Sequence, residues 1–243
     1  GVQTCALPIS PRHGGREGNG VGEPSKPAAA LYVIATPLGN LGDVSARARH
    51  MLAAADIVAC EDTRVTRRLY AALGLAAPRL IRCDDHAAER AAPLLIEAVR
   101  GGKIVALVSD AGTPLIADPG YRLVRAMREA GLAVTAVPGP SAAIAALSIS
   151  GLPCERFMVC GFLSAKAGAR ARQLTELKSV PATLAVFEAP HRLPESLAAM
   201  AEVLGPRQAA VARELTKMFE EVRGGTLDEL AGHYAAAGRS EEH

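Results

Sequence analysis

The sequence predicts an α/β protein with two domains, for three reasons. Short runs rich in Val, Ile and Leu alternate with stretches of helical periodicity, as in sheets whose strands are joined by crossover helices. Turn-forming residues cluster directly after several of these runs. The alternation stops at Gly151-Leu152-Pro153 and then starts again. We therefore expect an N-terminal α/β domain over residues 31–150 and a C-terminal α/β domain over residues 151–238.

The first domain is expected to contain five strands and five helices in alternation. Asp43 is expected to cap the first helix, Gly74 to end the second, and Gly101-Gly102 to end the third. The predicted strands span residues 31–35, 56–60, 79–82, 103–108 and 132–137. The predicted helices span residues 43–54, 63–73, 87–100, 121–130 and 141–150. Helices of this length between strands favour parallel pairing.

The second domain and the two ends follow a different pattern. Predicted strands span residues 157–161, 182–187 and 208–213, and predicted helices span residues 168–178, 193–204 and 226–236. Ten of the first thirty residues are Gly or Pro, and no periodicity precedes Leu31. We expect residues 1–30 to be a disordered or non-native tail and residues 239–243 to be an artefact foreign to the protein.

Composition excludes several classes of protein. Hydrophobic residues make up 49% of the chain, which excludes a disordered protein. The sequence contains no run of about 18 apolar residues, free of Gly, Pro and charged residues, that could span a membrane. The net charge is only +2, and aromatic residues make up 3%, too few for a base-stacking platform. Five scattered cysteines without a C-x-x-C pair predict neither disulfides nor a metal site, and favour the cytoplasm.

Three turns after predicted strands carry the residues of a possible ligand site. They span residues 36–43, 109–120 and 138–142, and ligands of open α/β sheets bind beyond such strand ends. None has the G-x-G-x-x-G pattern of dinucleotide binding or the P-loop pattern of triphosphate binding. We expect one shared pocket for a ligand without phosphates, held by backbone groups and one carboxylate. For Asp110, in the second turn, the alternative to a pocket role is a local turn-stabilising one.

Seven blocks of sequence, in order, carry a family resemblance. They are 31–43 (LYVIATPLGNLGD), 60–64 (CEDTR), 106–116 (ALVSDAGTPLI), 118–121 (DPGY), 138–142 (PGPSA), 188–192 (EAPHR) and 212–217 (ARELTK). The chain resembles the tetrapyrrole methylase superfamily and, within it, the type I ribosomal RNA cytidine ribose 2′-O-methyltransferases of bacteria. The resemblance extends over about residues 31–236.

The resemblance implies a class III methyltransferase fold that holds S-adenosylmethionine in the cleft between the domains. It assigns the cofactor to nine residues of the three turns: Pro37, Leu38, Gly39, Asp110, Ala111, Gly112, Thr113, Ser141 and Ala142. It also implies a homodimer, small-subunit ribosomal RNA as the partner, and no membrane. The family continues with a further strand after the last helix, so we expect the C-terminal domain to lack its last strand.

Candidate catalytic residues follow from the same blocks, and their roles stay open. Methyl transfer to a hydroxyl needs alignment and removal of a proton, and the candidates for the catalytic set are Asp62, Arg64, His191, Glu214 and Lys217. Asp62, Glu214 or His191 could be the base. Alternatively, Asp62 caps the next helix, and the cluster around Glu214 is a solvated set of ion pairs.

Contacts with RNA phosphates are expected from cations near the same cleft. Arg64 and Lys217 are joined in this role by residues outside the catalytic set, namely Arg192, Arg213, Lys166 and Arg170. Two other functions compete with RNA ribose methylation. One is methylation of a small tetrapyrrole such as a uroporphyrin or precorrin, and the other is a non-catalytic RNA-binding module.

Overall fold

A computed structural model describes residues 27–84 and 87–240. The expected tail up to residue 26 and the end of the chain at 241–243 lie outside the described residues. Ala30 is buried, and the Tyr32 hydroxyl donates to the carbonyl of Ala28 at 3.0 Å. The folded part therefore begins a few residues before the predicted boundary at Leu31.

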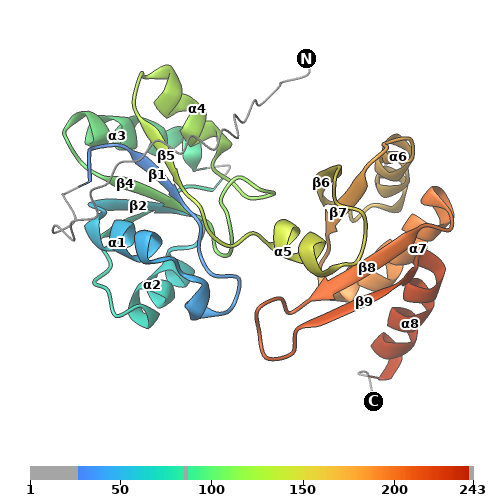
Figure 1. Ribbon diagram of the computed structural model, residues 1–243. Helices are drawn as coiled ribbons and strands as arrows, with labels where there is room; N and C mark the ends of the chain where they lie inside the picture. Colours follow the sequence, from blue (N-terminus) through green and yellow to red (C-terminus); the bar gives the residue numbers. More distant parts are fainter. Residues whose placement is uncertain (1–26, 85–86, 241–243) are drawn as a thin grey trace, which may run out of the picture.

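The N-terminal domain is built on a five-stranded parallel sheet in the order β3-β2-β4-β1-β5 (Figure 1). The strands are β1 (Leu31–Ile34), β2 (Ile57–Cys60), β3 (Arg79–Arg82), β4 (Val105–Val108) and β5 (Val134–Val137). Every residue of β2 and β4 is buried, as expected for strands covered on both faces. The predicted strands are confirmed, with three beginning one or two residues later than expected.

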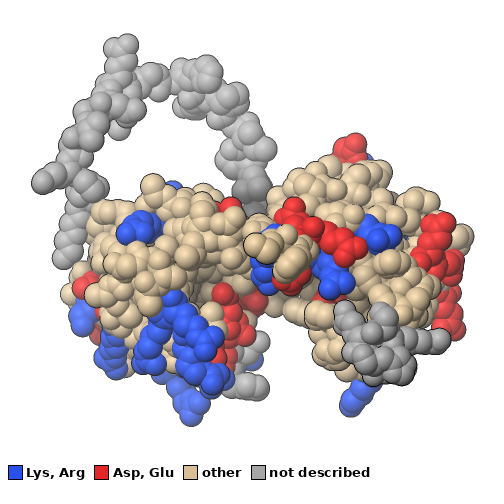
Figure 2. Space-filling model, turned by 90° about the horizontal axis from the view of Figure 1, so that it is seen from below, with Lys and Arg blue, Asp and Glu red and all other residues tan. Residues whose placement is uncertain are grey.

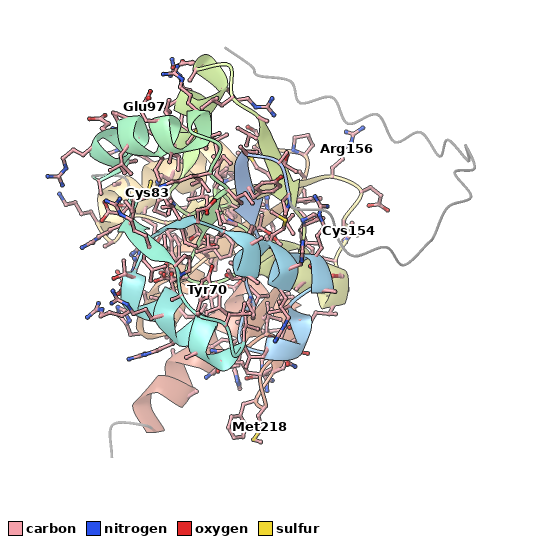
Figure 3. The ribbon with its side chains drawn as sticks, turned by 90° about the vertical axis from the view of Figure 1, so that its left-hand side faces the viewer. Tyr70, Cys83, Glu97, Cys154, Arg156 and Met218 are labelled. Atoms are coloured by element: carbon pink, nitrogen blue, oxygen red, sulfur yellow. The ribbon has the colours of Figure 1, made fainter. Side chains whose placement is uncertain are left out.

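Helices cover both faces of this sheet. Alternate strand residues point to opposite faces, so each strand contributes side chains to two cores. Tyr32 and Ile34 pack in one core with α1 (Ala46–Ala54) and α2 (Thr63–Ala72). Leu31 packs in the other core with α3 (Ala88–Arg100) and α4 (Tyr121–Glu129). Tyr70 of α2, labelled in Figure 3, is one of the buried side chains of the first core.

The start of α1 differs from the prediction. Ser45 is the N-cap, and its hydroxyl accepts from the amide of Ala48 at 3.0 Å. Asp43 lies instead in a short 3-10 helix, η1 (Leu41–Asp43), whose own cap is Asn40. The prediction that Asp43 caps α1 is therefore wrong, because the chain makes one extra turn before the helix begins.

The C-terminal domain follows α5 (Ala142–Ile149), which lies between the two domains in Figure 1. Its strands form two separate pairs. β6 (Phe157–Phe162) runs parallel to β7 (Thr183–Phe187), and β8 (Gln208–Arg213) runs antiparallel to β9 (Glu221–Thr226). Three helices and a 3-10 turn accompany them: α6 (Ala167–Leu177), η2 (Pro190–Arg192), α7 (Leu193–Leu204) and α8 (Leu227–Ser240).

Two features of this domain were not predicted. The sequence of β9, Glu-Val-Arg-Gly-Gly-Thr, has adjacent glycines that disfavour a strand in isolation, and pairing with β8 holds it extended. The helix α8 continues to Ser240, four residues past its predicted end and into the segment expected to be foreign.

A groove of about 1080 Å³ separates the two strand pairs. Residues of β7 and β8 line it together with apolar side chains of α7 and α8, among them Leu197, Met200 and Leu227. Within the described residues, β7 pairs with β6 alone and β8 pairs with β9 alone. Each of the two strands therefore has one backbone edge that no described strand pairs with.

Candidate cofactor pocket and catalytic residues

The three predicted turns meet at the carboxyl ends of β1, β4 and β5. Thr36 and Gly112 exchange backbone hydrogen bonds of 2.8 and 3.1 Å, which join the first turn to the second. The Thr113 hydroxyl donates to the carbonyl of Pro140 at 2.8 Å, which joins the second turn to the third. Parallel strands end at one edge of the sheet, so residues 36, 112 and 140 become neighbours despite their separation in the chain.

A pocket of about 220 Å³ lies beside the junction of the first two turns. It has apolar walls, three residues with hydroxyl groups and one carboxylate, and no Lys or Arg is among its lining residues. The pocket is lined by Thr36, Pro37, Leu38, Gly39, Leu41, Val65, Thr66, Leu69, Ser109, Asp110 and Ala111. Such a lining suits an uncharged or cationic ligand better than a phosphate.

Five of the nine residues predicted to bind the cofactor line this pocket, namely Pro37, Leu38, Gly39, Asp110 and Ala111. The other four, Gly112, Thr113, Ser141 and Ala142, belong to the turns behind it or to the start of α5. The contribution of α2 was missed. Val65 and Leu69 are four residues apart on one helix face, and this apolar spacing was the available signal.

Close backbone packing explains two of the glycines in these turns. A Cβ atom at Gly112 would lie 3.1 Å from Cδ2 of Leu38, and the positive φ of Gly112 (81°) is unfavourable for other residues. A Cβ atom at Gly139 would lie 3.0 Å from Cβ of Ala35. Larger side chains would therefore separate the turns that form the pocket.

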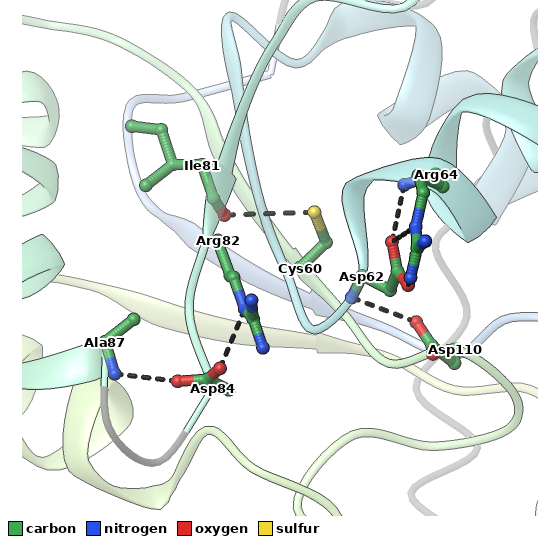
Figure 4. Close-up of polar contacts among 8 residues, drawn as sticks. All are labelled: Cys60, Asp62, Arg64, Ile81, Arg82, Asp84, Ala87 and Asp110. Carbon is green, nitrogen blue, oxygen red and sulfur yellow. Dashed lines mark hydrogen bonds and ion pairs between the residues drawn. The ribbon is translucent and has the colours of Figure 1, made fainter.

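Asp110 connects the pocket to the start of α2. One of its carboxylate oxygens accepts from the amide of Asp62 at 3.2 Å (Figure 4). Partial desolvation raises the pKa of the Asp110 carboxyl, with the nearby charge of Asp62 adding to the effect, although much of the residue remains exposed. Desolvation also raises the pKa of Asp118 at the end of the same turn. The two carboxyl groups make this edge of the sheet favourable for a cation.

Asp62 acts as the cap of α2, the structural alternative for this residue. Its Oδ1 accepts from the amide of Arg64 at 2.8 Å, and its Oδ2 lies 2.6 Å from Nη2 of Arg64 (Figure 4). These hydrogen bonds from Arg64 lower the pKa of Asp62 well below its usual value. A carboxylate held in this way accepts a proton poorly, so the arrangement disfavours Asp62 as the catalytic base.

Glu214 and Lys217 lie in the loop between β8 and β9, with Nζ of Lys217 3.3 Å from a carboxylate oxygen of Glu214. Glu214 and Thr216 have positive φ angles of 53° and 66°, which are strained for residues with a side chain. In the same loop, Met218 and Phe219 are strongly exposed, and Figure 3 shows Met218 projecting from the molecule.

The loop also touches the first domain. A Cβ atom built on Gly39 would lie 2.6 Å from Cγ and 2.7 Å from Cε of Lys217, so the lysine chain crosses directly over this glycine. Figure 1 shows the β8–β9 loop beside the turn that follows β1. Thus the structure brings Lys217 to the edge of the pocket.

His191 and Arg192 lie in η2, away from the small pocket. His191 and Glu214 both line the groove of the C-terminal domain. Arg192 donates to the carbonyl of Leu163 at 2.8 Å and pairs with the buried carboxylate of Glu188 at 3.4 Å. Because its side chain is only 22% exposed, Arg192 is engaged mainly within the domain.

The remaining predicted RNA contacts differ in accessibility. Arg213 is half exposed and lies 3.9 Å from Glu221, and Lys166 is exposed just before α6. Arg170 is 3% exposed, and its guanidinium donates to a carboxylate oxygen of Glu195 at 2.6 Å. The prediction that Arg170 contacts RNA therefore does not fit the structure. The helical period turns this residue toward α7 rather than toward solvent.

In the part of the chain that the structure describes, no helix has the length and apolar character needed to cross a membrane.

Comparisons with known proteins agree with this architecture. The family model of the Tetrapyrrole (Corrin/Porphyrin) Methylases matches residues 30–231. Ribosomal RNA small subunit methyltransferase I of Mesorhizobium japonicum is 56% identical over 216 residues, which cover 88% of this chain and 73% of that protein. The protein of the same name from Pseudomonas aeruginosa is 49% identical, with 84% and 72% covered.

Solved structures support the fold alone. A diphthine synthase superposes with a TM-score of 0.62 at 19% identity, with 83% of each chain covered. The uroporphyrin-III-C-methyltransferase of Thermus thermophilus gives a TM-score of 0.56 at 23% identity, covering 84% of this chain and 88% of that chain.

Proposed function

Because the chain belongs to the tetrapyrrole methylase family, we propose that it transfers a methyl group from S-adenosylmethionine to small-subunit ribosomal RNA. The observation that carries this proposal is the 56% identity to a ribosomal RNA small subunit methyltransferase I, over a region that contains all three pocket turns. We assign the reaction more narrowly to the ribose 2′-hydroxyl of a cytidine, the specificity that the family resemblance implies.

The pocket residues fit S-adenosylmethionine. This cofactor has no phosphate and carries positive charge on its sulfonium and ammonium groups. The pocket contains a single carboxylate, that of Asp110, no Lys or Arg, and apolar walls from Leu38, Val65 and Leu69. Gly112 lets the second turn pack closely against Leu38 of the first, and Gly39 leaves room for the side chain of Lys217 at the pocket edge. We therefore assign the adenosine and its hydroxyl groups to the turns after β1 and β4.

The bound cofactor would supply an electrophilic methyl group, and the protein would align the acceptor hydroxyl and accept its proton. Lys217 lies over Gly39 at the pocket edge, so the β8–β9 loop is well placed to position the acceptor. Of the three candidates for the base, Asp62 is the least suitable, because its carboxylate caps α2 and pairs with Arg64. We assign the role of base to Glu214 rather than His191, because Glu214 forms an ion pair with Lys217, the residue at the pocket edge.

The two competing functions receive less support. The relatives at 45–56% identity share the name ribosomal RNA small subunit methyltransferase I, whereas the porphyrin methyltransferase similarity is at 23% identity and concerns the fold. A pocket that fits the cofactor also disfavours a purely RNA-binding module.

We further propose that the protein works as a homodimer in the cytoplasm, where ribosomal subunits are found. Apolar side chains of α5 and β6 remain exposed in the single chain and could form the dimer surface. They are Ile144, Ile149, Phe157, Met158 and Phe162. Light scattering of the purified protein tests this, since a monomer at all concentrations would contradict it.

The function is tested by incubating the full chain with small ribosomal subunits and S-adenosylmethionine labelled in its methyl group. Ribose methylation blocks alkaline cleavage at the next phosphate, so the label should appear in an alkali-resistant dinucleotide that contains cytidine. Label in single nucleotides would indicate base methylation. Label in a uroporphyrin substrate and none in RNA would overturn the proposal.

A further inference from the structure

Five arginines lie on α2 and β3, and we call this set of residues the arginine face. Residues 63–82 contain five Arg and no Asp or Glu. All five are exposed, namely Arg64, Arg67, Arg68, Arg79 and Arg82. The first three are spaced by three and four residues on one side of α2, opposite the buried Thr66 and Tyr70. Figure 2, the view from below, shows Lys and Arg side chains gathered on the surface of the N-terminal domain.

Only part of this charge is neutralised. Arg64 is paired with Asp62 at 2.6 Å, and Arg82 with Asp84 at 2.8 Å. Among the described residues, no carboxylate forms an ion pair with Arg67, Arg68 or Arg79.

The arginines of α4 provide a contrast within the same domain. Arg122 is paired with Glu89 and Arg125 with Glu129 at 2.7 Å, and Arg128 is the one arginine of this helix without an ion pair among the described residues. Most of the charge on α4 is thus paired, whereas three of the five arginines of the arginine face have no ion pair with a carboxylate among the described residues.

The arginine face also lies close to the candidate cofactor pocket. The same helix α2 contributes Val65, Thr66 and Leu69 to the pocket wall. An α-helix with its side chains is only about 10–12 Å across, so a polyanion bound to the outer side of α2 would lie about one helix diameter from the pocket. Guanidinium groups suit this task because they bind phosphate oxygens in a bidentate manner.

We propose that the arginine face binds the phosphate backbone of the small-subunit RNA next to the nucleotide that is methylated. The proposal rests on the function proposed above and extends the RNA contacts to a surface made by α2 and β3. Arg67 and Arg68 are central, because they have no carboxylate partner among the described residues and face solvent.

The test compares two double variants of the full chain that each remove two exposed arginines from one helix. Arg67→Ala/Arg68→Ala alters the arginine face, and Arg125→Ala/Arg128→Ala alters α4 on the other side of the sheet. The dissociation constant for isolated small ribosomal subunits is measured over a range of salt concentrations, together with the affinity for S-adenosylmethionine. Thermal melts establish that both variants fold.

Each phosphate contact contributes about 0.7–0.9 to the slope of log affinity against log salt. We expect Arg67→Ala/Arg68→Ala to reduce the slope by about 1–2 and to weaken subunit binding about tenfold or more near 0.1 M salt. The affinity for S-adenosylmethionine and the slope of the α4 variant should stay unchanged. An unchanged slope in the first variant, or an equal reduction in both, would overturn the proposal.

The two proposals fail in different ways. A chain that binds subunits through the arginine face but does not methylate them contradicts the proposed function alone. A chain that methylates RNA with the salt slope unaffected by Arg67→Ala/Arg68→Ala contradicts the arginine face alone.

Discussion

The side chain of Lys217 crosses over Gly39, so that a residue of the β8–β9 loop in one domain rests on the first turn of the other. The positions of Cγ and Cε of Lys217, 2.6 and 2.7 Å from where a Cβ of residue 39 would stand, leave no room for any other residue at position 39 without a shift. Gly39 lines the candidate pocket and Lys217 pairs with Glu214. This contact therefore couples the cofactor site to the proposed catalytic loop.

Substitution of Gly39 by Ala should displace Lys217 and slow methyl transfer about 10- to 100-fold, since small misplacements near a reacting centre have effects of this size. Gly168→Ala is the matched control, because nothing lies within 4 Å of a Cβ there. The single-turnover rate measures the effect. If the contact matters, the rate losses of Gly39→Ala and Lys217→Ala should not add in the Gly39→Ala/Lys217→Ala double variant. Fully additive losses would show that the contact has no role.

Replacement of Asp110 by Asn should weaken binding of S-adenosylmethionine about tenfold or more, because the amide loses the charge that attracts the cofactor. Affinity for small subunits should change little. Isothermal titration of the cofactor and subunit-binding assays separate the two. An equal loss of both would remove Asp110 from the pocket role.

The same variant has a predicted pH signature. Because desolvation raises the pKa of Asp110 above its value in the unfolded chain, the folded state holds this proton more tightly, and ionisation destabilises it. Stability from this group is therefore present at acidic pH and declines as pH rises through the folded pKa. Asp110→Asn should raise the Tm slightly at pH 7 and less at pH 4, as measured by thermal melts. A gain that grows on acidification would contradict this sign.

Replacement of Asp62 by Ala should lower the Tm by about 2–4 °C through loss of the α2 cap. Asp62→Asn should keep the cap and lose only the ion pair with Arg64. Since the pKa of Asp62 is lowered in the folded state, its stabilisation is complete above the unfolded value of 3.8 and is lost as pH falls further. Loss of methyl transfer in Asp62→Asn with an unchanged Tm would instead assign the role of catalytic base to Asp62.

Glu214→Gln should reduce kcat about 10²-fold, the usual contribution of a general base, with little change in cofactor affinity. His191→Ala is the comparison, because His191 lines the same groove as Glu214 but forms no ion pair with Lys217 among the described residues. A large loss of kcat in His191→Ala and a small one in Glu214→Gln would reverse the assignment.

Arg170→Ala should destabilise the protein by about 1–3 kcal/mol, because it removes a buried side chain and its contact with Glu195. RNA affinity of the folded fraction should remain near that of the unaltered chain. Lys166→Ala, an exposed neighbour, should leave the Tm unchanged. Thermal melts and subunit binding distinguish the two effects, and a stable Arg170→Ala variant with weaker RNA binding would restore the original prediction.

The amino-acid sequence by itself determined the order of the elements in the N-terminal domain. Hydrophobic runs such as Ile57–Cys60 are too short and too apolar for anything but buried strands, and Gly74 and Gly101 mark the ends of α2 and α3. The three pocket turns were also predictable, because their Gly, Pro and Asp residues are local signals that do not depend on distant contacts.

Only the tertiary structure decided which side chains meet. The backbone pair of Thr36 with Gly112, the contact of Lys217 with Gly39, and the burial of Arg170 join residues far apart in the chain or depend on which helix face is covered. β9 likewise exists because β8 offers it an edge, and its own glycines do not predict a strand. Local propensity fixes elements, whereas packing fixes the distances between them, and chemistry at this site depends on those distances.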